Sequence, residues 1–116
     1  MSHATITTHS GFLTVMNVFH TSAANQQKLL EALNGATERL FSKQPGFITA
    51  SFHRSHDGTK VANYAQWRSL ADYEAFLANP EVRAAMGPIV ALRASLDHGT
   101  YEVVSVHAPA ARPERS

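Results

Sequence analysis

The dipeptide Asp57-Gly58 limits what this chain can fold into more than any other short stretch. It separates residues 47–55 from residues 60–67, and both segments are rich in the β-branched and aromatic residues typical of strands. An Asp-Gly pair between two such segments is typical of a β-hairpin with a two-residue turn. The sequence therefore predicts two antiparallel strands joined at this dipeptide.

A two-residue turn fixes which residues of the two strands lie opposite each other. Successive side chains of a strand point to opposite faces, so the pairs fall into two sets. Counting back from the turn, one face carries the pairs Phe52–Asn63, Ala50–Ala65 and Ile48–Trp67. The other face carries the pairs His53–Ala62, Ser51–Tyr64 and Thr49–Gln66.

The other elements follow from periodicity and from residues that begin or end helices. Residues 12–20 are predicted to form a strand, and residues 23–43 a helix with Ser22 as N-cap and a stop at Pro45-Gly46. Ser69 and Asp72 have the spacing of a capping box, for a helix that runs to about Ala78 and buries Leu70, Tyr73, Phe76 and Leu77.

Proline and glycine indicate where helices begin and end in the last third of the chain. Asn79-Pro80 predicts the start of another helix, which Gly87-Pro88 is expected to break. Residues 89–96 are predicted to add a helical turn, and residues 99–107 to form the last strand.

The order strand, helix, strand, strand, helices, strand predicts an α+β fold of the ferredoxin-like kind, with an antiparallel four-stranded sheet covered by helices on one face. Its 116 residues suit one domain. We expect a flexible arm at residues 1–10, the ferredoxin-like domain at residues 11–107 and a disordered tail at residues 108–116.

The sheet face away from the helices is too apolar for solvent. It is predicted to carry Phe12, Met16, Val18, Phe47 and Tyr64 among polar residues. Burial against the sheet of a second copy is the simplest way to cover it, so we expect a homodimer.

Composition excludes several classes of partner. The net charge is +1 with no basic run, so nucleic-acid binding is not expected. The chain has no cysteine, which excludes disulfides and thiolate metal sites and fits a cytoplasmic location. No apolar run approaches the roughly 20 residues that span a bilayer, so no membrane partner is expected.

The helix-facing side of the sheet combines an apolar wall with two amides and an indole. Its members are Leu13, Val15, Asn17, Phe19, Ile48, Ala50, Phe52, Asn63, Ala65 and Trp67. A buried amide without a hydrogen-bond partner costs about 1–3 kcal/mol. Either the amides bond to helix backbone or water, or they meet a ligand in a cleft between sheet and helices.

A metal site could be sought at His53-x-x-His56. Positions three apart in a strand point to opposite faces, and no third ligand is evident. We therefore interpret these two as ordinary surface or barrel histidines and expect no bound metal.

The run DGTKVANYAQW at residues 57–67, with Tyr73 in the next helix, resembles the antibiotic biosynthesis monooxygenase family. It is most similar to the small cofactor-independent oxygenases of aromatic polyketide pathways, of the actinorhodin and nogalamycin types. The resemblance covers roughly residues 11–107. Further similar stretches are VMNVF at 15–19, PGF at 45–47, ALR at 91–93 and HG at 98–99.

The resemblance implies a dimer whose two sheets form an α/β barrel, and an enzyme that needs no cofactor or metal. Dioxygen would be the co-substrate, and an anthrone or phenol-type polyketide would be oxidised to a quinone through its enolate. The resemblance implies catalytic roles for Asn17, Asn63 and Trp67, while the residue that acts as base stays open. Substrate-binding residues implied by the resemblance and by the shared face are Tyr73, His53, Arg83, Phe52 and Ala65.

Three alternatives remain at the level of sequence. Relatives in this family degrade haem, but that chemistry needs a histidine ligand on the helix after the tryptophan. The helix here has none, and His98 is predicted to lie in a later loop. The same residues could also serve a polyketide cyclase that does not use oxygen, or a dimeric binding protein without enzymatic activity.

Overall fold

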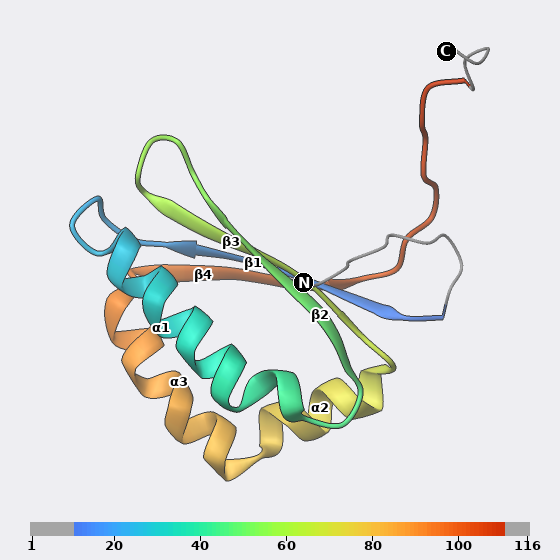
Figure 1. Ribbon diagram of the computed structural model, residues 1–116, viewed down its shortest axis with the longest axis horizontal. Coiled ribbons are helices and arrows are strands. Elements are labelled where there is room, and N and C mark those ends of the chain that lie inside the picture. The colour runs from blue at the N-terminus through green and yellow to red at the C-terminus, as the bar shows by residue number, and fades with distance from the viewer. Residues whose placement is uncertain (1–10, 111–116) are drawn as a thin grey trace.

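Three helices pack on one face of a four-stranded sheet (Figure 1). The computed structural model describes residues 11–110. The predicted arm at residues 1–10, and residues 111–116 of the predicted tail, lie outside the described residues. Residues 102–110 contain no helix or strand.

The sheet is antiparallel throughout, has the strand order β2-β3-β1-β4 and is not closed. This order confirms the predicted ferredoxin-like α+β fold. The strands are β1 Leu13–His20, β2 Phe47–Arg54, β3 Lys60–Trp67 and β4 Ser95–Tyr101.

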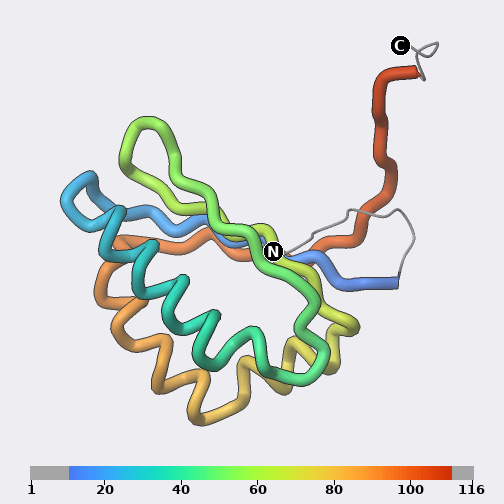
Figure 2. The backbone as a smooth tube through the Cα atoms, viewed as in Figure 1, coloured from blue at the N-terminus to red at the C-terminus, as the bar shows by residue number. Residues whose placement is uncertain are grey.

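The helices lie beneath the sheet in Figures 1 and 2, and the core lies between the two layers. They are α1 Gln26–Arg39, a short 3₁₀ helix at Phe41–Lys43, α2 Leu70–Ala78 and α3 Pro80–Leu92. Each layer contributes residues that are no more than 1% exposed: Val15 and Val61 from the sheet, Leu29 and Val82 from the helices. Among the described residues, no helix is long and apolar enough to cross a membrane.

The predicted hairpin register is correct, although the turn is longer than two residues. Phe52 lies opposite Asn63 and Ala50 opposite Ala65, as counted from the sequence. The strands end at Arg54 and resume at Lys60, so residues 55–59 form the loop. The register survives because Arg54 still lies opposite Val61, and the Ser55 N–H donates to the Lys60 carbonyl at 3.0 Å.

Asp57 organises this loop through its carboxylate. Its Oδ1 accepts hydrogen bonds from the Thr59 hydroxyl at 2.7 Å, the Ser55 hydroxyl at 2.8 Å and the Thr59 backbone N–H at 3.0 Å. The bond from the Thr59 hydroxyl is the first cause of a lowered Asp57 pKa, followed by the Thr59 N–H and the Ser55 hydroxyl.

An irregularity in β2 reverses the prediction for Phe47 and Ile48. The register shifts between Phe47 and Thr49, so Phe47 rather than Ile48 lies opposite Trp67. Phe47 therefore joins the helix-facing side instead of the outer face, and Ile48 is 40% exposed. A bulge sets two residues against one on the partner strand, which a strict alternation count cannot anticipate.

The second and third helices begin where the sequence predicts, but the first does not. Ser69 accepts from the Asp72 N–H at 3.1 Å, which confirms the predicted cap, and Asn79 accepts from the Glu81 N–H at 2.8 Å at the predicted helix start. The Ser22 prediction is wrong: the N-cap of α1 is Asn25, and Ser22 instead uses its backbone carbonyl to accept the N–H groups of Asn25 and Gln26. The turn made by these bonds precedes the helix.

Helix α3 continues through Pro88, so the predicted break at Gly87-Pro88 is wrong. Proline removes one helical hydrogen bond, but Val82 before it and Ile89 after it are buried at 0% and 2% exposure. Their packing offsets the lost bond. The predicted burial of Leu70 and Leu77 is also wrong, because α2 is short and turns Tyr73 and Phe76 toward the core.

The last strand begins earlier and ends earlier than residues 99–107. β4 pairs with β1 from His20–Ser95 to Thr14–Tyr101. Residues after Tyr101 have strand-like composition, but β1 begins at Leu13 and offers them almost no further partner. This shift places His98 within a strand rather than in a loop.

The turn at Gly46 gives a test of backbone strain. Its φ is +84°, and an added Cβ would overlap the Asp72 side chain. We expect Gly46→Ala to lower the free energy of unfolding by more than about 1 kcal/mol, measured by urea denaturation. Gly35→Ala in α1 is the matched control and should be neutral or stabilising, because its Cβ would meet only the end of the Arg39 side chain at 3.4 Å. Equal stability of Gly46→Ala and the wild type would contradict the strain.

The Asp57 loop gives a test of pH dependence. Because the folded-state pKa lies below the ordinary value of 3.8, the carboxylate stabilises the fold above that value and stops doing so as the pH falls below it. Asp57→Ala should therefore lower the melting temperature at neutral pH, with a deficit that shrinks below about pH 4. Asp57→Asn keeps an acceptor oxygen and should lower the melting temperature less than Asp57→Ala does. If the difference in melting temperature between Asp57→Ala and the wild type does not change with pH, the charge of Asp57 does not contribute to stability.

Candidate functional site

A cavity of about 360 Å³ lies between the sheet and the helices. Small-molecule sites in proteins usually have roughly 300–1,000 Å³. Its walls come from β1, β2, β3 and β4 on one side and from the helices on the other, and most of the lining side chains are apolar or aromatic. The cleft predicted between sheet and helices is therefore present.

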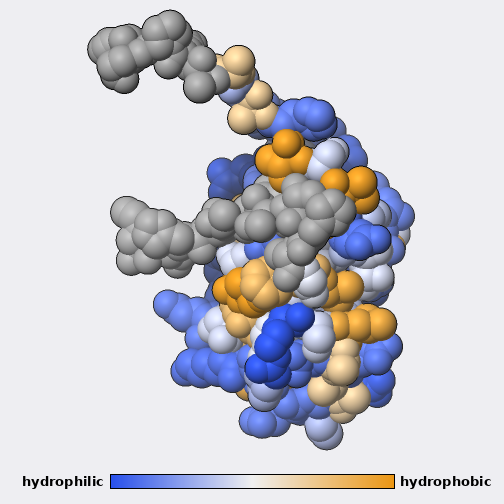
Figure 3. Space-filling model, turned by 90° about the vertical axis from the view of Figure 1, so that its right-hand side faces the viewer, coloured by the Kyte–Doolittle hydropathy of each residue, from blue (hydrophilic) through white to orange (hydrophobic). Residues whose placement is uncertain are grey.

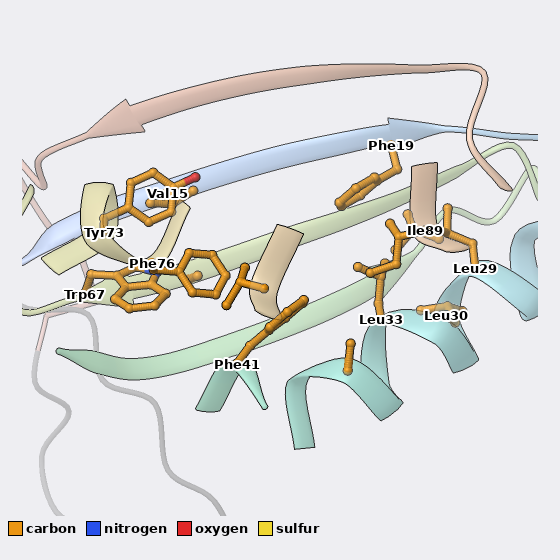
Figure 4. Close-up of a cluster of buried hydrophobic side chains, with 14 residues drawn as sticks. Val15, Phe19, Leu29, Leu30, Leu33, Phe41, Trp67, Tyr73, Phe76 and Ile89 are labelled. Carbon is orange, nitrogen blue, oxygen red and sulfur yellow. The ribbon is translucent and has the colours of Figure 1, made fainter. Parts of the chain in front are cut away.

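Aromatic rings crowd one end of the cavity, where Trp67 contacts three of them (Figure 4 shows two). The indole is 3% exposed and meets Phe47 edge-on at 5.4 Å between ring centroids. Phe76 and Tyr73 lie tilted against it at 4.7 and 5.6 Å. These flat apolar walls suit a planar aromatic ligand.

Polar side chains cross the sheet in a single row. Asn17 of β1 lies directly opposite Asn63 of β3 on one side and His98 of β4 on the other. All three line the cavity. The Asn17 Oδ1 accepts a short hydrogen bond from Nδ1 of His98. We call Asn63, Asn17 and His98 the polar row.

The amide of Asn63 is the least satisfied polar group in the cavity. Its Oδ1 is fully buried and has no hydrogen-bond partner among the described residues. Leaving such an atom unpaired costs about 1–3 kcal/mol. Within residues 11–110, no hydrogen bond is made by the Trp67 indole N–H or the Tyr73 hydroxyl either. Donors and an acceptor thus lie uncommitted around an apolar space.

The cavity is nearly free of formal charge. Its described lining contains no Asp, Glu, Lys or Arg, and only Tyr73 and His98 are titratable. Burial raises the pKa of Tyr73 to about 12, so the phenol stays protonated at neutral pH and can donate but not take a proton. Dipoles of amide, indole and hydroxyl groups, rather than carboxylate or ammonium groups, therefore face the cavity.

The structure brings six of the eight predicted site residues to the cavity. Those lining it are Asn17, Phe52, Asn63, Ala65, Trp67 and Tyr73. Ala50 also lines it, and the small side chains of Ala50 and Ala65 leave room for a ligand.

Two predicted substrate-binding residues lie elsewhere. His53 pairs with Ala62 on the opposite face and is exposed, as the alternation of β2 requires. Arg83 is exposed, does not line the cavity, and donates through Nε to the Leu77 carbonyl at 3.0 Å. The neighbouring Val82 faces the core, which turns Arg83 outward. The assignment of Arg83 to the pocket is corrected on this geometry.

The described residues contain no group of three or more His, Cys, Asp or Glu side chains that could hold a metal ion. His53 and His56 are both exposed, the first on the outer sheet face and the second in the hairpin loop. The structure thus does not bring the His53-x-x-His56 pair to the cavity.

His98 is the cavity residue that sequence reasoning missed. The strand-like run at residues 99–107 predicts a last strand that begins after His98 and leaves it in a loop. The alternation that continues backward through His98 and Leu96, both of which line the cavity, could have revealed the earlier start. The ring of Tyr73 stacks on His98 at 6.0 Å and 22° between planes.

Comparison with known proteins places these features among enzymes. The family model for antibiotic biosynthesis monooxygenases matches residues 12–87. Tetracenomycin-F1 monooxygenase of Streptomyces glaucescens is 44% identical over 80 residues, which cover 69% of this chain and 71% of that relative.

Solved structures share the fold. The monooxygenase from the gene ActVA-Orf6 of Streptomyces coelicolor, crystallised with nanaomycin D, has a TM-score of 0.74 and 30% identity over 86% of this chain and 93% of its own. SnoaB of Streptomyces nogalater, described as a cofactor-independent oxygenase, has a TM-score of 0.70 over 84% of this chain and 97% of its own. Its identity is 22%, so it supports the fold alone.

These matches confirm the predicted family and the predicted monooxygenase class. The family match spans β1 to the middle of α3, which includes Asn17, Asn63, Trp67 and Tyr73. The chain belongs to the antibiotic biosynthesis monooxygenase family.

Proposed function

We propose that this protein is a cofactor-independent monooxygenase that uses O₂ to oxidise an aromatic polyketide, of the anthrone or phenol type, to a quinone. The observation that carries the proposal is the buried, unpartnered Oδ1 of Asn63, on the same face of β3 as Trp67, in an apolar cavity. The relatives named above, a tetracenomycin-F1 monooxygenase and a monooxygenase crystallised with nanaomycin D, support the substrate class.

The substrate itself can supply the electrons. Dioxygen is a ground-state triplet that reacts slowly with closed-shell molecules, and cofactors usually overcome this barrier. A deprotonated anthrone is electron-rich enough to pass one electron to O₂. The resulting pair of radicals then forms a carbon–oxygen bond and yields a substrate peroxide.

The balance of the reaction requires no other reductant. Anthrone methylene plus O₂ gives the quinone carbonyl plus water. One methylene proton leaves to form the enolate, and the second leaves when the peroxide O–O bond breaks heterolytically. One oxygen atom stays on carbon and the other leaves as water.

The cavity favours the anion on which this reaction depends. The Asn63 Nδ2–H can donate to the enolate oxygen, and its Oδ1 can accept from a neighbouring phenol hydroxyl on the substrate. The Trp67 N–H and the Tyr73 hydroxyl are further donors, and their rings can pack on a planar ligand. In an apolar, nearly uncharged space such donors act more strongly than in water.

We also propose that the protein is a cytoplasmic homodimer. The sheet face away from the helices carries Met16, which is 40% exposed, and the open sheet leaves this face without a covering layer of helices. Phe12, Leu70 and Tyr101, which line one pocket next to the start of the C-terminal segment, are 41%, 50% and 51% exposed. Figure 3 shows apolar side chains among polar ones at the end of the molecule where this segment leaves. A second copy of the same face is the simplest cover.

Sedimentation equilibrium tests the dimer. We expect a mass about twice the 12.7 kDa of the chain, and Met16→Glu should shift it toward that of the single chain, because it would place a charge in the interface. A single-chain mass for the wild type at micromolar concentration would contradict the proposal.

Oxygen uptake tests the enzymatic proposal. Purified protein, supplied with no flavin or metal, should consume O₂ with dithranol or emodin anthrone above the spontaneous rate. Asn63→Ala and Trp67→Phe should each lower the rate by roughly tenfold or more, the scale expected for losing one oriented donor.

Asn34→Ala is the matched control, because it makes the same chemical change on an exposed position of α1 outside the cavity. It should keep wild-type activity. No turnover above background across a panel of aromatic polyketides would count against the monooxygenase reaction. Full activity of both folded cavity variants would instead refute the assignment of Asn63 and Trp67.

A further inference from the structure

We propose that His98 is the general base that takes the proton from the substrate, and that Asn17 and Tyr73 hold its ring in the form needed for this task. The inference rests on the proposed function and names the residue that the reaction still lacks. It depends on the hydrogen bond within the polar row and on the composition of the cavity wall.

The hydrogen bond to Asn17 determines which ring nitrogen of His98 carries the proton. The Asn17 Oδ1 is an acceptor only, so the His98 Nδ1 must donate to it. A neutral imidazole carries one proton, which leaves the lone pair on Nε2. Nε2 makes no hydrogen bond to any residue that the structure describes, so it is available as a proton acceptor.

The composition of the cavity leaves His98 as the base. In the described lining, Tyr73 is the only other titratable side chain. Its pKa of about 12 keeps it protonated at neutral pH. The amides of Asn17 and Asn63 and the indole of Trp67 cannot take a proton at this pH. Imidazole, by contrast, is the side chain that most often serves as a general base in enzymes.

The groups that face the imidazole orient it. Asn17 bonds to it from β1, and the Tyr73 ring of α2 stacks on it at 6.0 Å. Asp97, the neighbour of His98 along β4, forms a hydrogen bond between its Oδ2 and Nε2 of His20 at 2.8 Å. Asn17 and Tyr73 are therefore positioning residues for His98, in addition to any contact they make with the substrate.

The position of His98 in the sheet suits a base that must release its proton after each catalytic cycle. β4 is an edge strand, and His98 is exposed while also lining the cavity. The proton can thus pass from the buried substrate to Nε2 and from there to solvent. Alternatively, the imidazolium returns its proton to the peroxide anion. The neutral ring then takes the second methylene proton as the O–O bond breaks and gives it to the departing hydroxide to form water. Water and quinone leave with the imidazole neutral again, so the cycle is balanced.

Hydrogen–deuterium exchange of the dithranol methylene group under anaerobic conditions tests the base separately from the oxygenation. The wild type should accelerate exchange above the buffer rate, because exchange needs only proton removal and return. His98→Ala should lower this acceleration roughly 100-fold or more. Added imidazole should restore part of it, which a purely structural role of His98 would not allow. His107→Ala, at an exposed histidine outside the cavity, should leave it unchanged.

The outcomes separate the two proposals. If His98→Ala accelerates exchange as much as the wild type does, His98 is not the general base, even if the wild type consumes O₂. Histidine-dependent exchange without O₂ uptake supports the base and overturns the monooxygenase reaction. If the wild type accelerates neither process, both proposals fail.

A second measurement does not depend on activity. NMR of protein labelled with ¹⁵N-histidine reports which ring nitrogen of His98 is protonated. We expect the Nδ1–H form, and His98→Ala identifies the resonance by its loss. The Nε2–H form would overturn the proposal.

Discussion

The register of β1 against its two neighbours is the constraint on which the rest of the site depends. Asn63, Asn17 and His98 meet over the cavity because they occupy opposite positions in three adjacent strands. A slip of one residue in any pairing would send one of them to the other face of the sheet. The Asp57 loop holds β2 to β3, and the bulge at Phe47 then turns an additional ring toward Trp67.

The low charge of the cavity explains how so few polar groups can control reactivity. The described lining residues include no carboxylate or ammonium group. The cavity therefore favours a ligand that forms hydrogen bonds with the Asn63 amide and the Trp67 N–H. The same burial raises the pKa of Tyr73 and removes it as a base. One environment thus stabilises a substrate anion and assigns proton transfer to His98, the exposed member of the polar row.

The sequence predicted the features that depend on local patterns. Alternation on either side of Asp57-Gly58 predicted the register of Asn63 and Ala65 and the face on which Trp67 lies, and the helix starts at Ser69 and Asn79 follow from residue type and spacing.

Features decided by non-local packing could not be predicted in this way. The bulge that exchanges Phe47 and Ile48 has no local marker, and Pro88 is tolerated only because residues on both sides are buried. The start of β4, and with it the place of His98, is set by pairing with β1.

The central claim is that this cavity holds an aromatic substrate as its anion without help from a cofactor. The most direct test is the absorption spectrum of dithranol titrated with the protein under anaerobic conditions at neutral pH. Binding should produce the spectrum of the anion, and admitting air should then convert the bound substrate to the quinone. A bound substrate that keeps the spectrum of its neutral form and persists in air would contradict the account.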